Sequence, residues 1–406
     1  MYAVPRLLPG RAPAWALALL LAAGFLGVSA AAREGKLDAA ALGKLIEQLG
    51  DDDADRRAEA ARKLEALGEE ALPTLRKAAA RHADADVRLR AAVVAAAIGK
   101  KLYGEIQKFE GHKGWVFRVT LTPDGKKAVS SGDALRLWDL KTGKCLRTFG
   151  EGLGGWGLCV SRDGKRVLCS CPDNSVRLWE LETGKEVQRF TGHTNHAWAA
   201  SLSPDDKYAV TGGLDRTVRV WDVGTGKEVR QFKGVADYPR CLAWAPDGKH
   251  LAIGHYRDEN FMTSAGTVRV WEFATGKEVK AFEGHTGAIT ALAYDKGGKR
   301  IASSSFDKTI RVWDLDRGKE VKRITGHPGP VDGVAFTPDG KRVVSCGWDD
   351  DHTVRVWDVA SGKELARYEG HTLGPLCVAV TPDGKRVLSS GKDGTLRLWP
   401  LPKATR

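Results

Sequence analysis

The sequence lacks the short motifs that mark common catalytic and metal sites. It has no His-Glu-x-x-His, no Cys-x-x-Cys and no Gly-x-x-x-x-Gly-Lys-Ser/Thr, the patterns of zinc proteases, redox or zinc sites and phosphate-binding loops. Gly150 to Gly155 matches a dinucleotide fingerprint as text, but it lies between two predicted strands and opens no helix, so we interpret it as a loop. The sequence therefore predicts no enzyme, no cofactor and no resident metal.

Cysteine is also scarce. Seven cysteines in 406 residues are too few for a disulfide scaffold, and the odd number leaves at least one unpaired. Cys169 and Cys171 fall on one face of a predicted strand, as packed thiols or with one of them bridged to a neighbour such as Cys159. The chain is otherwise globular in composition, with 42% hydrophobic and 28% charged residues and a formal charge of +12. This composition excludes a disordered chain, and the 47 glycines and 13 tryptophans favour short strands and tight turns.

Only one long hydrophobic run is present, at the N-terminus. Arg6 and Arg11 precede the uncharged stretch 12–32, which ends in small residues including Ala30. This pattern is typical of a secretory signal peptide. The run is also long enough to cross a bilayer, so an uncleaved anchor over residues 12–32 stays open. Either interpretation of residues 1–32 predicts an extracytoplasmic protein: secreted, periplasmic or membrane-anchored and facing outward.

Residues 36–100 are rich in Ala, Leu, Arg and Glu and contain an internal repeat. The pattern Asp53-x-Asp55-x-Arg57 recurs as Asp84-x-Asp86-x-Arg88, and a glycine follows each predicted second helix. We expect two helix pairs, 39–49 with 54–67 and 69–80 with 85–98. This segment resembles HEAT-type helical repeats. It is a stabilising cap or, alternatively, a docking module, and its packing on the rest of the chain is left open.

The remainder of the chain is a sevenfold repeat. Arg-x-Trp recurs every 41 to 50 residues, usually followed by an acid. The seven Trp pairs are Trp138–Asp139, Trp179–Glu180, Trp221–Asp222, Trp271–Glu272, Trp313–Asp314, Trp357–Asp358 and Trp399–Pro400. Gly-His pairs recur five times, and Pro-Asp-Gly-Lys or a variant appears once per repeat. A period near 43 with these marks indicates blades of four strands.

Over residues 101–400 the sequence resembles the WD-repeat β-propeller family. The resemblance implies a mainly β fold, a seven-bladed β-propeller of four-stranded antiparallel blades, preceded by the small all-α segment and followed by a short tail, 401–406. Gly104–Phe109 matches the strand that follows each Trp motif, such as Lys185–Phe190, yet it precedes the first repeat. We therefore expect it to complete the last blade and remove a free sheet edge.

The resemblance also implies buried hydrogen-bond sets of His, Ser or Thr, Asp and Trp. By position these sets are His193, Thr211, Asp215 and Trp221; His285, Ser303, Asp307 and Trp313; His327, Ser345, Asp351 and Trp357; and His371, Ser389, Asp393 and Trp399. The third set requires a longer turn. Blade one offers no Asp in the matching register, and blades two and four, with Glu151 and Val235 in place of His, are expected to be incomplete and least rigid. We interpret all these residues as structural, not catalytic.

In the family, the entry loops and the turns between the second and third strands form the binding face. Its exposed positions lie three and five residues after the Gly-His histidine, and here aromatic or Arg side chains fall on blades one to four, small residues on the rest. The partner-binding candidates are Trp115, Phe117, Trp156, His196, Trp198, Tyr238 and Arg240, with Tyr256 and Phe261 of the insertion 255–265. Trp, Tyr and Arg dominate binding energy at interfaces. Alternatively, these aromatics pack as core under the loops.

The resemblance implies a non-catalytic, monomeric scaffold that binds a protein or peptide through this face, and the N-terminal segment predicts that this scaffold is exported. A carbohydrate or cell-wall binding module is the alternative, because exposed aromatics also stack on sugars. A propeller lyase or lactonase is weaker, since the channel mouth offers only His196 and Asp332. Few aromatics interleave with the lysines of the turns, so no nucleic-acid partner is expected.

Overall fold

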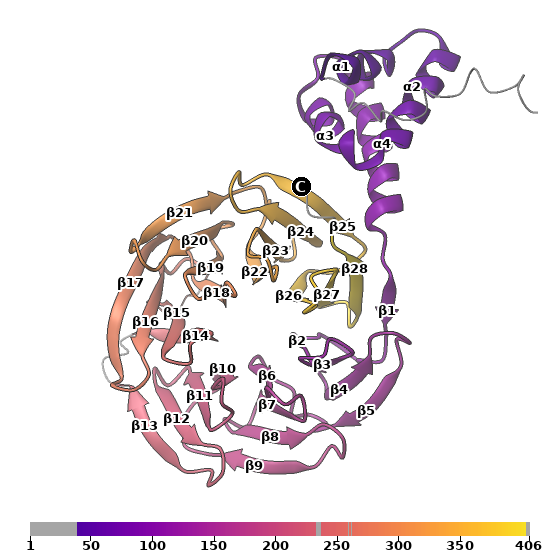
Figure 1. Cartoon of the computed structure of the whole chain (residues 1–406). Coiled ribbons are helices and arrows are strands. Elements are labelled where there is room, and N and C mark those ends of the chain that lie inside the picture. Colours follow the sequence, from indigo (N-terminus) through magenta and orange to yellow (C-terminus); the bar gives the residue numbers. More distant parts are fainter. Residues whose placement is uncertain (1–38, 233–236, 259, 261, 403–406) are drawn as a thin grey trace, which may run out of the picture.

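Figure 1 shows the computed structural model, which describes residues 39–402 apart from 233–236, 259 and 261. The predicted signal segment 1–32, Phe261 and most of the predicted tail lie outside the described residues. Four helices precede seven four-stranded antiparallel sheets that stand around a central axis. The seven-bladed propeller expected from the repeat is confirmed. None of the helices in the described ranges is long and apolar enough to span a membrane.

The helices begin and end at the residues that the sequence marks for capping. They are α1 (Ala39–Gln48), α2 (Ala54–Leu67), α3 (Leu72–Arg81) and α4 (Ala85–Tyr103), with a short 3-10 turn at Gly68–Glu70. The side chains of Asp53 and Asp84 accept hydrogen bonds from the first backbone N–H groups of α2 and α4. Gly68 ends α2 with φ 58°, a conformation that favours glycine. The helices are present as predicted, and the likeness to HEAT-type repeats stays a prediction.

Each blade runs from an innermost strand at the channel to an outermost strand at the rim. Blade one is β2 (Arg118–Leu121), β3 (Lys127–Ser131), β4 (Leu135–Asp139) and β5 (Cys145–Phe149); blade two is β6 (Leu158–Val160), β7 (Arg166–Ser170), β8 (Val176–Glu180) and β9 (Glu186–Phe190); blade three is β10 (Ala197–Leu202), β11 (Tyr208–Gly213), β12 (Val218–Asp222) and β13 (Glu228–Phe232). Blade four is β14 (Tyr238–Trp244), β15 (His250–Tyr256), β16 (Gly266–Glu272) and β17 (Lys277–His285); blade five is β18 (Ile289–Tyr294), β19 (Arg300–Ser305), β20 (Ile310–Asp314) and β21 (Lys319–Ile324). Blade six is β22 (Val331–Phe336), β23 (Arg342–Gly347), β24 (Thr353–Asp358) and β25 (Glu364–Glu369); blade seven is β26 (Pro375–Val380), β27 (Arg386–Gly391), β28 (Leu396–Pro400) and β1 (Gln107–Phe109).

The ring of blades is closed by the two ends of the propeller sequence. β1 pairs antiparallel with β28, with Gln107 opposite Leu398 and Phe109 opposite Leu396. The expected completion of the last blade by the N-terminal strand is therefore confirmed. Because this pairing covers the outer edge of β28, blade seven has the same four strands as the other blades.

The core lies mainly between neighbouring blades, where the repeated tryptophans are buried. Phe149, from the outermost strand of blade one, packs on Trp179 of blade two with ring centroids 5.7 Å apart, and Phe282 packs on Trp313 at 5.3 Å. This contact explains why each repeat keeps a Trp and an apolar residue at the end of its outer strand. All seven cysteines are free thiols, and Cys169 and Cys171 are buried, so the disulfide alternative is wrong.

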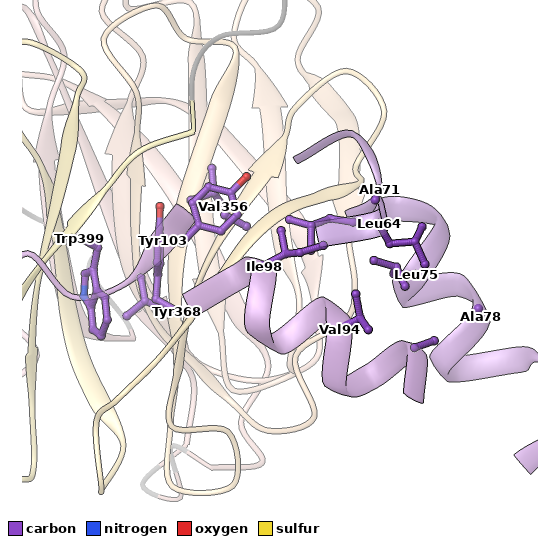
Figure 2. Close-up of a cluster of buried hydrophobic side chains, with 14 of the residues drawn as sticks. Leu64, Ala71, Leu75, Ala78, Val94, Ile98, Tyr103, Val356, Tyr368 and Trp399 are labelled. Atoms are coloured by element: carbon purple, nitrogen blue, oxygen red, sulfur yellow. The ribbon is translucent and has the colours of Figure 1, made fainter. Parts of the chain in front are cut away.

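The helical unit packs on the propeller at the closure seam. Tyr103, at the end of α4, contacts Tyr368 edge to face at a centroid distance of 6.1 Å, and Tyr368 stacks on Trp399 at 5.4 Å (Figure 2). These rings join the helical core to that of blades six and seven in one continuous cluster. Arg397 forms an ion pair with Glu105 just after α4. The packing left open by the sequence is thus a direct contact with blades six and seven.

Candidate functional site

The recurring His residues belong to saturated hydrogen-bond sets. In blade five, the Nδ1 of His285 lies 2.7 Å from Asp307 Oδ2 and its Nε2 lies 2.8 Å from the Ser303 hydroxyl. The indole N–H of Trp313 donates to the same hydroxyl at 2.8 Å. Equivalent sets lie in contact in three further blades: His193, Thr211, Asp215 and Trp221; His327, Ser345, Asp351 and Trp357; and His371, Ser389, Asp393 and Trp399.

Blade one also has such a set, which corrects the expectation from its register. Its turn between β3 and β4 is shorter, and this brings Asp133 within 2.6 Å of His112 Nδ1. The Ser130 hydroxyl lies 2.7 Å from His112 Nε2 and accepts from Trp138 at 2.8 Å. In the other sets the Asp lies six residues before the Trp, whereas the shorter turn of blade one places Asp133 five residues before Trp138. A search at the usual offset therefore misses it.

Protonation in these sets suits a structural role. Burial lowers the pKa of His112 to about 4, despite the hydrogen bond to Asp133, and burial likewise lowers the pKa of His285 and His327. Burial alone would raise the pKa of Asp307, but the hydrogen bond from His285 holds it well below its ordinary value. The imidazoles of His112, His285 and His327 are therefore neutral near pH 7, and His285 donates to an ionised carboxylate. No position of such a set remains open for a substrate.

Blades two and four lack the hydroxyl that accepts from Trp. Cys169 and Ile253 stand at the place of Thr211 of blade three, each opposite the Arg of the next strand. The indole N–H groups of Trp179 and Trp271 are buried and have no hydrogen-bond partner among the described residues. These two blades are incomplete in the described part of the chain, and each forgoes a buried hydrogen bond.

The predicted binding aromatics of blades one to three form a chain of ring contacts. Trp115 lies 6.4 Å from Phe117, Phe117 lies 4.7 Å from Trp156, and Trp156 stacks on Trp198 at 6.0 Å, centroid to centroid. Trp115 is 45% exposed, and the other three are half-buried. The structure therefore brings these four residues from three blades into one patch on the face of the entry loops.

The chain of contacts continues into blades where only small residues were expected. The guanidinium of Arg240 lies 5.1 Å from the Trp198 ring and 5.0 Å from the ring of Phe306 in blade five. Phe306 lies 4.7 Å from Trp348 of blade six. Phe306 and Trp348 are not among the candidates predicted from the sequence, because those candidates came from the entry positions alone. Both stand in turns directly after the second strand, where an aromatic before an Asp is the signal.

Lys392 of blade seven contacts both Trp348 and Trp115 and so connects the two ends of this series of contacts. Its ammonium lies 4.4 Å from the Trp115 ring and 4.3 Å from the Trp348 ring, and it pairs with Asp349 at 2.6 Å. One or two side chains from each blade thus form a closed series of contacts, in which Arg240, Phe306 and Lys392 are buried. The channel ring, as we call it, consists of Trp115, Phe117, Trp156, Trp198, Arg240, Phe306, Trp348 and Lys392.

Three candidates of blade four are buried, which corrects the expectation that they are exposed. Tyr238 and Tyr256 are 8% and 3% exposed and stack on each other at 4.9 Å, while Arg240 is 5% exposed. They are buried because β14 begins at Tyr238, so these positions lie in a strand and not in a loop. For Tyr238 and Tyr256 the alternative expectation, that the aromatics pack in the core, is therefore the correct one. His196 is exposed, and the structure records no ring contact for it.

Below the channel ring is a cavity of about 190 Å³ lined by the innermost strands of all seven blades. Arg118 and Arg240 line it. The carboxylate of Asp332, which is 1% exposed, lies 3.8 Å from Arg118 and 3.5 Å from Arg240. Asp332 thus faces two guanidinium groups, and it is not placed with His196 as an acid–base pair would require. In the described ranges, no three His, Cys, Asp or Glu side chains cluster closely enough to hold a metal ion.

Comparison with known proteins gives two similarities. A family model described as "WD domain, G-beta repeat" matches the chain seven times, at residues 104–139, 143–180, 184–222, 226–272, 276–314, 318–358 and 362–400. The chain is also similar to "Small ribosomal subunit protein RACK1y" of Oryza sativa subsp. japonica, with 38% identity over 71 residues. That alignment covers 17% of this chain and only 21% of the rice protein.

Proposed function

This chain belongs to the WD domain, G-beta repeat family, and we propose that it is a non-catalytic scaffold that binds a protein partner through the channel ring. Propellers of this family are typical protein-interaction scaffolds. The observation that carries the proposal is the channel ring, with Trp115 45% exposed at its edge. Partly exposed Trp side chains in a contiguous patch are the usual anchors of protein interfaces.

The saturated His sets support a scaffold over an enzyme. Each imidazole, hydroxyl and indole in them already has its partner, and the histidines of blades three and five to seven are buried. The similarity to the rice protein supports the shared repeat architecture and no more, because it covers about a fifth of that protein.

We also propose that the protein acts outside the cytoplasm, on the support of residues 1–32. The test fuses residues 1–38 to a reporter enzyme that folds only after export. Reporter activity with the wild-type segment, lost when a charged residue replaces Leu19 in the apolar run, supports export. Equal reporter activity with the wild-type and the substituted segment, or no activity with either, contradicts export.

The decisive experiment for the scaffold is a pull-down from the extracytoplasmic fraction with the full chain and two variants. Trp115→Ala removes the most exposed ring side chain, and Leu146→Ala removes an apolar side chain of similar exposure, 47%, from the outer strand β5. We expect one protein recovered with the wild type and with Leu146→Ala, and lost with Trp115→Ala. Equal recovery with both variants contradicts binding at the channel ring.

The carbohydrate alternative is separated in the same experiment by soluble glycans. A protein partner stays bound when cell-wall glycan fragments are added, since they do not compete for its contacts. Release by these fragments, together with direct retention of the chain on an insoluble glycan, identifies a glycan-binding module and contradicts the protein interface.

A further inference from the structure

The aromatic faces of the channel ring already carry cations of this chain. The Arg118 guanidinium lies 5.6 Å from the Trp156 ring, Arg240 lies over Trp198, and Lys392 lies over Trp115 and Trp348. Aromatic faces attract cations through the negative charge of their π systems. Because these faces are already occupied, a partner's Lys or Arg would meet both competition and like-charge repulsion.

The wall of the cavity presents positive charge. Arg118 and Arg240 line the cavity, whereas the carboxylate between them, Asp332, is 1% exposed and does not. Its separations of 3.8 and 3.5 Å from the two guanidinium groups are long for charge-assisted hydrogen bonds. The two guanidinium groups thus line a space away from bulk water, where electrostatic interactions are strong. No lining residue of the cavity carries a carboxylate.

The size and the remaining walls of the cavity fit a single side chain. Its volume is about 190 Å³, and its lining also includes apolar side chains, among them Leu158, Ala200 and Val378 from three different blades. Trp156 and Trp198 stand at its upper edge. A side chain with a carboxylate and one or two methylene groups matches both the charge and the apolar wall.

We propose that the partner inserts the carboxylate of a Glu or Asp side chain into the channel, against Arg118 and Arg240 and beside the stacked rings of Trp156 and Trp198. This inference rests on the proposed function and specifies the chemistry of its anchor. The source is a peptide segment and not a free carboxylate, because the exposed Trp115 and its neighbour Phe117 extend the contact surface beyond the cavity. A small anion would leave that surface uncovered.

The test titrates the full chain with three blocked tripeptides that differ only in the central residue: acetyl-Gly-Glu-Gly-amide, its Gln analogue and its Arg analogue. Binding is followed through the indole N–H signals of Trp156 and Trp198 in NMR spectra, assigned with Trp156→Phe and Trp198→Phe. We expect the Glu peptide to shift these signals with an affinity about tenfold higher than the Gln peptide, and the Arg peptide to bind weakest. Equal affinities for Glu and Gln, or preference for Arg, overturn the inference.

Two further arms separate the remaining explanations. Acetate is titrated alone, and binding as tight as that of the Glu peptide identifies a small-anion site and overturns the peptide source. Arg118→Met should remove most of the preference for Glu over Gln, and Arg118→Lys, which keeps the charge, should retain part of it. If Arg118→Met fails to fold, Arg118→Lys alone carries the arm, and an unchanged preference contradicts the role of Arg118.

Failure of the inference is distinguishable from failure of the proposed function. Partner recovery that depends on Trp115 with no preference for Glu leaves the scaffold intact and removes the acidic anchor. If the Glu peptide is preferred at Trp156 and Trp198 but partner recovery does not depend on Trp115, the acidic anchor is supported and the binding of a protein through the channel ring is contradicted.

Discussion

At the scale of the residue, most buried polar groups of the propeller serve the fold. The Ser303 hydroxyl is the centre of its set, since it bonds His285 and accepts from Trp313. The sets could be placed through the family resemblance because His and Ser or Thr keep a separation of 18 residues. The blade-one Asp133 could not, because a shorter turn moved it out of register.

Ser303→Ala should lower the free energy of unfolding by about 2 kcal/mol, because it leaves the indole N–H of Trp313 and the Nε2 of His285 without their partner in the core. Urea unfolding followed by circular dichroism measures the change. Cys169→Ala is the matched control, since Cys169 occupies the same position of blade two and bonds no indole there. Equal losses in both variants would mean that packing, not the hydrogen bonds, matters at this position.

Acid should destabilise the protein before its carboxylates titrate. Burial lowers the pKa of His112 to about 4 and that of His255 to about 3, whereas an unfolded His titrates near 6.5. Between these values the unfolded chain binds more protons than the folded chain, so stability falls as the pH drops from about 6.5 toward 4. We expect urea midpoints that decrease over this range, with a shallower decrease in His112→Asn. A midpoint that stays constant between pH 6.5 and 4.5 contradicts neutral buried histidines.

At the scale of the element, the repeat made the strands predictable, and the absence of a repeat hid the helix contact. The Trp and Gly-His marks fixed seven blades and the closing strand β1. The docking of α4 on blade six depends on Tyr103 and Tyr368, which are distant in sequence and belong to no shared pattern. Phe306 and Trp348 do share a pattern, an aromatic before an Asp, but their contact joins two different blades and is visible only in the structure.

Tyr103→Ala should loosen the helical unit and leave the propeller folded. The substitution removes the edge-to-face contact with Tyr368 and creates a cavity at the seam, so amides of α4 should exchange with solvent roughly a hundredfold faster. Hydrogen exchange followed by mass spectrometry measures this change, with the exchange rates of β18 to β21 as the internal reference. Leu102→Ala, at a neighbouring side chain that is 37% exposed, should have little effect. Faster exchange across all blades in Tyr103→Ala would mean that the contact supports the whole ring.

At the scale of the whole molecule, rigidity should vary around the ring of blades. Blades three and five hold complete sets, whereas Trp179 and Trp271 of blades two and four have no partner for their indole N–H among the described residues. We expect amides of β7, β8, β15 and β16 to exchange faster than those of β11, β12, β19 and β20 in native hydrogen exchange. Uniform exchange would show that contacts between blades, not the sets within them, govern local opening.

The pairing of β1 with β28 also has a consequence for the order of synthesis. A ribosome makes β1 before blade one and β28 after the other described strands, so β1 has no strand partner while six blades are synthesised. During that time both β1 and the growing edge of the sheet lack their final partners, the state in which β-proteins most readily associate wrongly. The helical unit is complete before β1 is made, and it is joined to the N-terminal end of β1 while β28 is still to be synthesised. In the folded protein β28 is then paired with β1, the first strand made.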